Sequence, residues 1–387
     1  MKIAWIADTH VGNHRLLGGP LEAGVNYRCQ LVVAALANAV QQAVNEGCTH
    51  LIGCGDLFDA ANPAPQVVAA VQRVLVRGEA LGLEIILLKG NHDIVTEAGG
   101  DHALGPLERQ ALIVESPQRV QLEQRRPDPE QPGARRRVLD SVELWAVPFQ
   151  PGAAAEWLPS VLAGMQGDSS KGSPPASPQR ILALHLGLQD GKTPPWLQGA
   201  HDSIEVEVLA DLLEKHGIRW CFAGNWHEPQ QWEFHGPNDE GPRSQVTQVG
   251  CTAPTGWDNP GLKYGTMAIL DTGTGKLPRI LEVPGPRFVA SASEAESAVK
   301  KGCQVFVRLK DGTPEEAAAA VKAGAQHVEV RVDDGEAQAQ LRTAAALARS
   351  ADNVDEAVAN YVATMPISPE LRAEVLARVK RFLGGAT

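Results

Sequence analysis

Five short apolar runs in this chain each end on residues that can hold a metal ion. Short apolar runs bounded by turn residues read as buried strands. In layered α/β folds, ligand sites lie just beyond the carboxyl ends of strands. We therefore expect the polar residues after these runs to converge on one edge of one sheet. The runs are residues 2–7, 50–55, 84–89, 180–184 and 219–223, followed by Asp8-Thr9-His10, Asp56, Gly90-Asn91-His92-Asp93, His185 and Gly224-Asn225-Trp226-His227.

The donors in this set are carboxylates, imidazoles and amides. Such mixed nitrogen and oxygen donors suit manganese, iron or zinc better than calcium. Asp56 has an oxygen that can bridge two cations, and Asn91 offers a neutral carbonyl oxygen. Two ions ~3.5–4 Å apart would activate a water molecule and hold a phosphate oxygen, so the pattern indicates a two-metal hydrolase. We expect His92 outside the metal shell, protonating the leaving oxygen, with Asp93 orienting its imidazole.

The composition excludes several other classes of protein. The 387 residues are 43% hydrophobic and 21% charged, and the net charge of −11 argues against gripping nucleic acid through an overall positive field. The first apolar run is too short for a signal peptide, and no stretch approaches the ~20 apolar residues of a membrane span. The six cysteines show no CxxC spacing, so we expect buried free thiols and a cytoplasmic location.

The order of the predicted elements indicates an α/β fold. Helices predicted near residues 26–46 and 66–80 alternate with the first three strands, which implies parallel pairing with right-handed crossovers. The arginine-rich stretch 119–137 joins two strand-like runs, so we predict a long exposed hairpin loop that is either solvated or in contact with DNA phosphates. Residues 168–179 have linker composition, and residues 247–283 read as a β-meander.

The sequence changes character after Pro286. Strands and helices alternate over residues 286–335, which predicts a small α/β domain after a main domain of residues 1–285. Residues 336–387 read as a linker followed by a C-terminal helical hairpin. The last helix has apolar residues at helical spacing, so one face either packs on its own domain or binds a partner.

Several motifs, taken in order, resemble those of the calcineurin-like metallophosphoesterases. They are DxH, GD, GNHD, a lone histidine after a strand and a final GxxH. Three stretches resemble more closely the SbcD-type nucleases of DNA double-strand-break repair, and the similarity covers most of residues 1–283. These stretches are Gly55-Asp56-Leu57-Phe58-Asp59, Gly90-Asn91-His92-Asp93 and Val249-Gly250-Cys251-Thr252-Ala253-Pro254.

The resemblance implies a layered metallophosphoesterase β-sandwich flanked by helices, in which residues 286–335 form a DNA-contacting capping domain. It also implies two manganese ions, DNA as substrate, and a homodimer whose C-terminal helices dock on an SbcC-like ABC-type ATPase in a two-plus-two complex. By this resemblance one ion would bind Asp8, His10, Asp56 and His227. The other would bind Asp56, Asn91, His185 and the residue at position 225.

Position 225 departs from the family pattern. The family has GHxH at this place, whereas this chain has Gly224-Asn225-Trp226-His227. An amide oxygen coordinates more weakly than an imidazole. We therefore expect the second ion to bind loosely, or to be held mostly by the other three ligands of its set.

These features lead to the hypothesis of a manganese-dependent DNA nuclease, by resemblance a 3′–5′ exonuclease and endonuclease acting on DNA ends in repair or recombination. One alternative is a phosphoesterase for small phosphodiesters or phosphoproteins, although such substrates need neither the small domain nor the helical tail. Another is a catalytically weakened subunit that binds DNA ends or regulates the ATPase.

Overall fold

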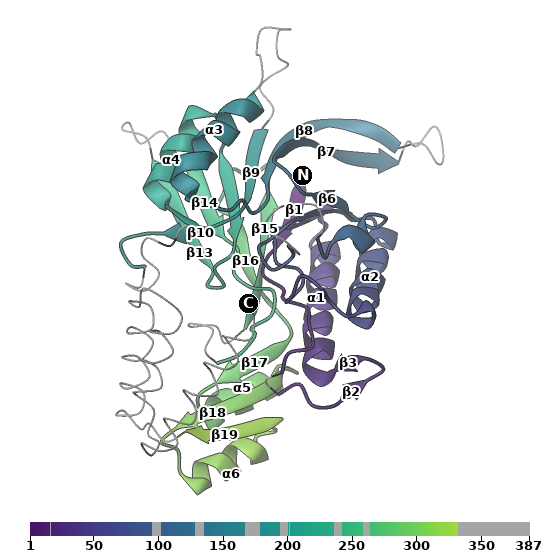
Figure 1. The fold of residues 1–387 in the computed structure, drawn as a ribbon, viewed down its shortest axis with the longest axis vertical. Coiled ribbons are helices and arrows are strands. Elements are labelled where there is room, and N and C mark those ends of the chain that lie inside the picture. Colours follow the sequence, from purple (N-terminus) through teal and green to yellow (C-terminus); the bar gives the residue numbers. More distant parts are fainter. Residues whose placement is uncertain are drawn as a thin grey trace, which may run out of the picture. The chain divides into compact units, whose positions relative to one another are not determined.

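The computed structural model describes residues 1–15, 17–94, 102–127, 135–166, 179–193, 200, 202–235, 242–257 and 264–331 (Figure 1). The chain divides into two compact units. The first contains residues 1–308 and 318–328, and the second contains residues 309–317 and 329–387. The linker predicted at residues 168–179 lies outside the described residues except for Gln179, and the helical hairpin predicted within residues 336–387 lies entirely outside them.

One six-stranded sheet contains the first three predicted strands. Strands β1, β4, β5 and β6 are parallel, whereas β15 runs antiparallel to β1 and β16 antiparallel to β15. The parallel pairing predicted from the order of strands and helices is confirmed. In spatial order the sheet consists of β16 (Arg279–Val283), β15 (Gly265–Asp271), β1 (Lys2–Ile6), β4 (His50–Gly53), β5 (Glu84–Leu88) and β6 (Leu112–Val114).

Two helices connect the first three parallel strands. Helix α1 (Tyr27–Asn45) follows Asn26, whose side chain accepts a hydrogen bond from Cys29 N at 2.9 Å and so caps the helix. Helix α2 (Pro65–Ala80) begins with a proline, which the first turn of a helix tolerates. Apolar side chains of both helices share one buried core with side chains of β1, β4 and β5.

A second six-stranded sheet packs against the first. Trp5 of β1 and Phe222 of β12 stack with ring centroids 3.8 Å apart inside a core that both sheets supply. Helices α3 (Ala154–Gln166) and α4 (Val206–Lys215) cover the outer face of the second sheet (Figure 1). The spatial order of this sheet is β13 (Gln230–His235), β14 (Pro242–Gln248), β12 (Trp220–Gly224), β9 (Gln179–His185), β8 (Arg135–Val147) and β7 (Gln118–Pro127). These layers confirm the predicted α/β sandwich flanked by helices.

The second sheet corrects two details of the sequence prediction. Strands β7 and β8 pair as far as Pro127 opposite Arg135, so much of the arginine-rich stretch predicted as a loop lies in strands. The ladder satisfies backbone hydrogen-bonding groups whatever side chains it carries. Residues 128–134, between the two strands, lie outside the described residues. The predicted meander is divided, because β14 belongs to the second sheet while β15 and β16 form a hairpin in the first.

The chain after residue 285 forms a smaller sheet with the predicted alternation of strands and helices. Strand β17 pairs in parallel with β18, and the order is β17, β18, β19. The elements are β17 (Pro286–Val289), α5 (Ala292–Lys300), β18 (Gln304–Lys310), α6 (Pro314–Lys322) and β19 (His327–Arg331). The first compact unit extends past residue 285 to residue 308. The domain limits 1–285, 286–335 and 336–387 stay predictions.

Short elements complete the part of the chain that the structure describes. They are β2 (Leu21–Glu22), β3 (Val25–Asn26), the 3₁₀ turn η1 (Gly105–Leu107), β10 (Gly187–Gln189) and β11 (Ser203–Glu205). All six cysteines are buried free thiols, as predicted. Within the described ranges, every helix is too short or too polar to cross a membrane.

Candidate metal centre

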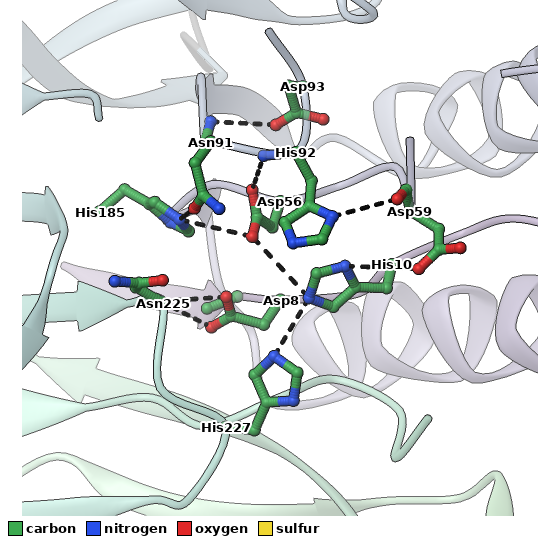
Figure 2. A network of polar contacts seen from close by, with 12 residues as sticks. Asp8, His10, Asp56, Asp59, Asn91, His92, Asp93, His185, Asn225 and His227 are labelled. Atoms are coloured by element: carbon green, nitrogen blue, oxygen red, sulfur yellow. Dashed lines mark hydrogen bonds and ion pairs between the residues drawn. The ribbon is translucent and has the colours of Figure 1, made fainter. Parts of the chain in front are cut away.

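The polar residues predicted at five strand ends do meet in one place (Figure 2). The prediction that they lie on a single sheet is wrong, however. Strands β1, β4 and β5 belong to the first sheet, and β9 and β12 belong to the second. The two sheets join at this edge through His185 of β9, whose Nδ1 donates to the carbonyl oxygen of Cys54 at 2.7 Å. The donors therefore converge on the junction between two packed sheets.

Four of the predicted ligands have an unusual backbone conformation. Asp8, His10, Asp56 and Asn225 have φ angles of 47°, 49°, 52° and 92°. Residues other than glycine seldom adopt this left-handed region, and each such residue costs about 1–3 kcal/mol unless its surroundings compensate. Backbone hydrogen bonds hold the turn after β1, since Asp8 N donates to Gly55 O at 3.1 Å and His10 N donates to Asp56 O at 3.0 Å. Strain of this kind is typical of functional sites.

Two glycines give the ligands room to approach. A Cβ atom on Gly90 would overlap the carboxylate and backbone nitrogen of Asp56, and a Cβ atom on Gly55 would overlap the ring of His185. Gly55 also has a φ angle of 93°, which glycine adopts without steric cost. The glycines of the GD and GN motifs therefore let ligands from separate strands come into contact.

One group of possible metal ligands contains Asp8, His10 and His227. Their ligand atoms all lie within 4.8 Å of one another. The Nε2 atoms of the two histidines are 3.1 Å apart, so both imidazoles point toward one spot beside Asp8. Asp56 Oδ2 lies 3.8 Å from His10 Nε2. The four residues that the resemblance implied for one ion are thus close enough to share it.

A second group contains Asp8, Asp56 and His185, again with ligand atoms within 4.8 Å of one another. His185 Nε2 lies 3.5 Å from Asp56 Oδ2 and 2.8 Å from Asn91 Oδ1. Asp56, Asn91 and His185 therefore meet as predicted. Asp8 is a member of both groups, so its carboxylate lies close to the ligand atoms of each.

The charges of the site fit a cation. Burial, assisted by the Asp56 charge, raises the pKa of Asp8 to about 8, and burial raises the pKa of Asp93 to about 6. Burial would also raise the pKa of Asp56, but the adjacent His185 charge holds it below its usual range. A cluster of buried carboxylates is unfavourable without positive charge nearby. Divalent ions would supply that charge, so the donor set fits a metal centre.

The two buried histidines of the site differ in their protonation. Burial lowers the pKa of His10 to about 3, so its imidazole is neutral and can coordinate. Burial alone would lower the pKa of His185, but the Asp56 carboxylate raises it to about 9. Metal ligands must be deprotonated, so an ion that binds His185 would displace its proton.

The structure corrects the role expected for Asp93. Its carboxylate accepts hydrogen bonds from Gly90 N at 3.0 Å and Phe58 N at 3.1 Å, and so holds the turn after β5. The backbone oxygen of Asp59 instead accepts from His92 Nδ1 at 3.1 Å and orients that imidazole. These two backbone donors have no other acceptor in the described structure. The fully buried Asp93 carboxylate therefore accepts from them, and the His92 ring bonds the backbone of Asp59 instead.

Asp59 is a functional candidate to which the sequence pattern assigned no role. Its carboxylate lies 3.9 Å from His10 Nδ1 and 3.6 Å from His14 Nδ1. His14 Nε2 in turn donates to the backbone oxygen of His10 at 2.8 Å. A carboxylate that hydrogen-bonds a histidine ligand orients its ring, but the 3.9 Å to His10 Nδ1 is an ion-pair distance, and this nitrogen makes no hydrogen bond within the described residues. The signal was present in the sequence as the last residue of Gly55-Asp56-Leu57-Phe58-Asp59.

With this geometry in place, the chain can be assigned to a family. Residues 1–229 match the model of the calcineurin-like phosphoesterase family, and the protein belongs to that family. Its members are metal-dependent phosphoester hydrolases, which is the chemistry that the two donor groups support.

Two relatives are named DNA double-strand break repair protein Mre11. The Sulfurisphaera tokodaii protein is 24% identical over 189 residues, covering 49% of this chain and 41% of the relative. The Methanopyrus kandleri protein is 26% identical over 113 residues, covering 29% of this chain and 24% of the relative. The chain thus matches less than half the length of either. A dimetal phosphatase structure from Danio rerio is 12% identical, with a TM-score of 0.38 over 73% of this chain and 99% of that one.

Proposed function

We propose that the protein is a manganese-dependent nuclease that hydrolyses the phosphodiester backbone of DNA. The observation that carries this proposal is the pair of overlapping donor groups around Asp8. The partial similarity to two proteins named for DNA double-strand break repair favours DNA over a smaller phosphoester. By its resemblance to the SbcD-type enzymes it would act on DNA ends as a 3′–5′ exonuclease and as an endonuclease.

The metal ligands would divide between two ions, with Asp56 in both sets. One ion would be held by Asp8, His10, Asp56 and His227. The other would be held by Asp56, Asn91, His185 and Asn225. Nitrogen and oxygen donors in this mixture suit Mn²⁺. When bound, the two ions would activate a water molecule and neutralise charge on the phosphate.

The position of His92 supports a role in the last step of the reaction. Its ring lies edge-on to that of His10, with centroids 4.7 Å apart, and its side chain is exposed. Because Nδ1 donates to the Asp59 backbone oxygen, the nitrogen available to a substrate is Nε2. We assign Nε2 the delivery of a proton to the departing sugar oxygen.

The first test of this function is a cleavage assay on labelled linear duplex DNA. We expect the duplex to be degraded with Mn²⁺ and to stay intact with excess EDTA, because the ligands alone cannot activate water. Separate 3′ and 5′ labels report the direction of degradation. Turnover of bis-p-nitrophenyl phosphate without any cleavage of DNA would favour a small-substrate phosphoesterase instead.

We further propose that residues 286–335 form a DNA-contacting cap and that the C-terminal helices bind an SbcC-like ABC-type ATPase. The active assembly would contain two copies of each chain and would act on cytoplasmic DNA. The cap and the docking helices are both inferred from the family resemblance. Neither stretch contains a predicted metal ligand.

Deleting residues 354–387 tests the docking of the tail. We expect the truncated chain to lose association with the ATPase, as measured by light scattering during gel filtration of the mixed proteins. Its Mn²⁺ binding is expected to stay that of the full chain, because none of the metal ligands lies in the deleted segment. Unchanged association would assign the docking surface to another part of the chain.

A further inference from the structure

The side-chain amide of Asn225 has a fixed direction in this structure. Its Nδ2 donates to the backbone oxygen of Asp202 at 3.2 Å and to Asp202 Oδ2 at 3.0 Å. Both partners are acceptors only, so the amide nitrogen has to face Asp202. The amide oxygen therefore faces the opposite way, and Figure 2 shows it on the side of Asp8.

The backbone of Asn225 is tied to the metal centre as well. Its N–H donates to Asp8 Oδ1 and Oδ2, both at 3.0 Å. Asp8 belongs to the group of possible ligands that also contains Asp56 and His185. The backbone of Asn225 is thus held beside Asp8, and its side-chain amide is oriented by Asp202.

Asp202 is itself held in place by β10, the short strand that follows His185 in the chain. It directly precedes β11, which pairs with β10 two residues beyond His185. The backbone oxygen of Asp202 also accepts a hydrogen bond from Gly187 N at 2.9 Å. A Cβ atom on Gly187 would overlap the indole of Trp226, so the residue after Asn225 packs directly on β10. These contacts fix the distance between Asp202 and the amide.

We propose that Asp202 is a positioning residue that makes Asn225 a metal ligand. By holding Nδ2, it presents Oδ1 to the second ion at the position where the family pattern has an imidazole. An asparagine without this partner would also present its NH₂ group, which repels a cation. The proposal rests on the two-metal centre, and it explains how this chain can fill the position with a weaker donor.

The test is Asp202→Ala in the full chain, because alanine removes the side-chain acceptor of Asn225 Nδ2, which asparagine could still supply through its amide oxygen. The backbone bond to Gly187 is retained, and thermal unfolding checks the fold. We expect calorimetric titration of the metal-free protein with Mn²⁺ to show an unchanged first ion. The second ion should bind about 10–100-fold more weakly, the usual effect of losing a residue that orients a ligand. Electron paramagnetic resonance should show fewer coupled Mn²⁺ pairs.

The same substitution is then made in an Asn225→His background, because an imidazole ligand does not depend on the orientation of an amide. There, Asp202→Ala is expected to change second-ion affinity by less than about twofold. An equal loss of second-ion affinity in both backgrounds would mean that Asp202 has only a structural role. No loss of that affinity in the native background would refute the proposal. A native chain that binds only one Mn²⁺ would refute it too. Two bound ions with coupling as expected, but no DNA cleavage, would refute the nuclease function alone.

Discussion

The substitution Asp56→Asn is expected to abolish hydrolysis, lowering kcat by at least about a thousandfold. Asp56 Oδ2 lies between the ring nitrogens of His185 at 3.5 Å and His10 at 3.8 Å, so its charge serves both groups of ligands. Loss of the Asp56 charge removes several kcal/mol of transition-state stabilisation, and each 1.36 kcal/mol is a factor of ten in rate. The measurement is kcat for DNA hydrolysis together with the metal content of the purified variant.

The metal content separates loss of the centre from loss of chemistry. We expect Asp56→Asn to retain less than one Mn²⁺ per chain, because a shared ligand affects both ions. Asp211→Asn is the matched control, since Asp211 is exposed on α4, a helix that contains none of the predicted ligands. Retention of more than about a tenth of the activity would show that Asp56 does not bridge the two ions.

The strand ends were predictable because the local signal is strong. Each run of buried residues is bounded by turn residues, and β1, β4, β5 and β12 are buried over nearly their whole length. A run of this kind has few alternatives to a central strand. The ligands follow from the strand ends, so the sequence alone placed Asp8, Asp56 and His185 at one site.

The distribution of the strands between two sheets was not predictable from the same pattern. Buried strands of either sheet have the same apolar composition, and the contacts that join the sheets connect distant residues. The bond from His185 to Cys54 spans 131 positions in the sequence. Short-range spacing carries no information about such contacts.

The partners of polar side chains were the least predictable feature. Asp93 follows His92 directly, which made it the obvious carboxylate to orient that ring. The structure gives this role to the backbone of Asp59, 33 positions earlier. Asp202 carried no recognisable motif, because its importance depends on the asparagine at position 225 and on a backbone bond to Gly187. Hydrogen-bond demand in a buried site, rather than proximity in sequence, decides these pairings.

Replacing His92 by glutamine is expected to lower kcat for DNA by about 10²–10⁴-fold while leaving both metal affinities unchanged, because general acid catalysis contributes on that scale. The backbone N–H of His92 donates to Asp56 Oδ1 at 2.9 Å, and the substitution preserves this bond. Single-turnover rates on linear duplex DNA give the effect on chemistry.

The choice of leaving group distinguishes proton delivery from a structural role for His92. A p-nitrophenolate leaves without a proton, so hydrolysis of bis-p-nitrophenyl phosphate should fall far less in His92→Gln than cleavage of DNA. The matched control is His235→Gln, because His235 is an exposed histidine at the end of β13. An equal loss on both substrates would mean that His92 stabilises charge on the phosphoryl group instead of protonating the sugar oxygen. Because Nδ1 donates to the backbone oxygen of Asp59, a proton delivered to the sugar oxygen has to come from Nε2.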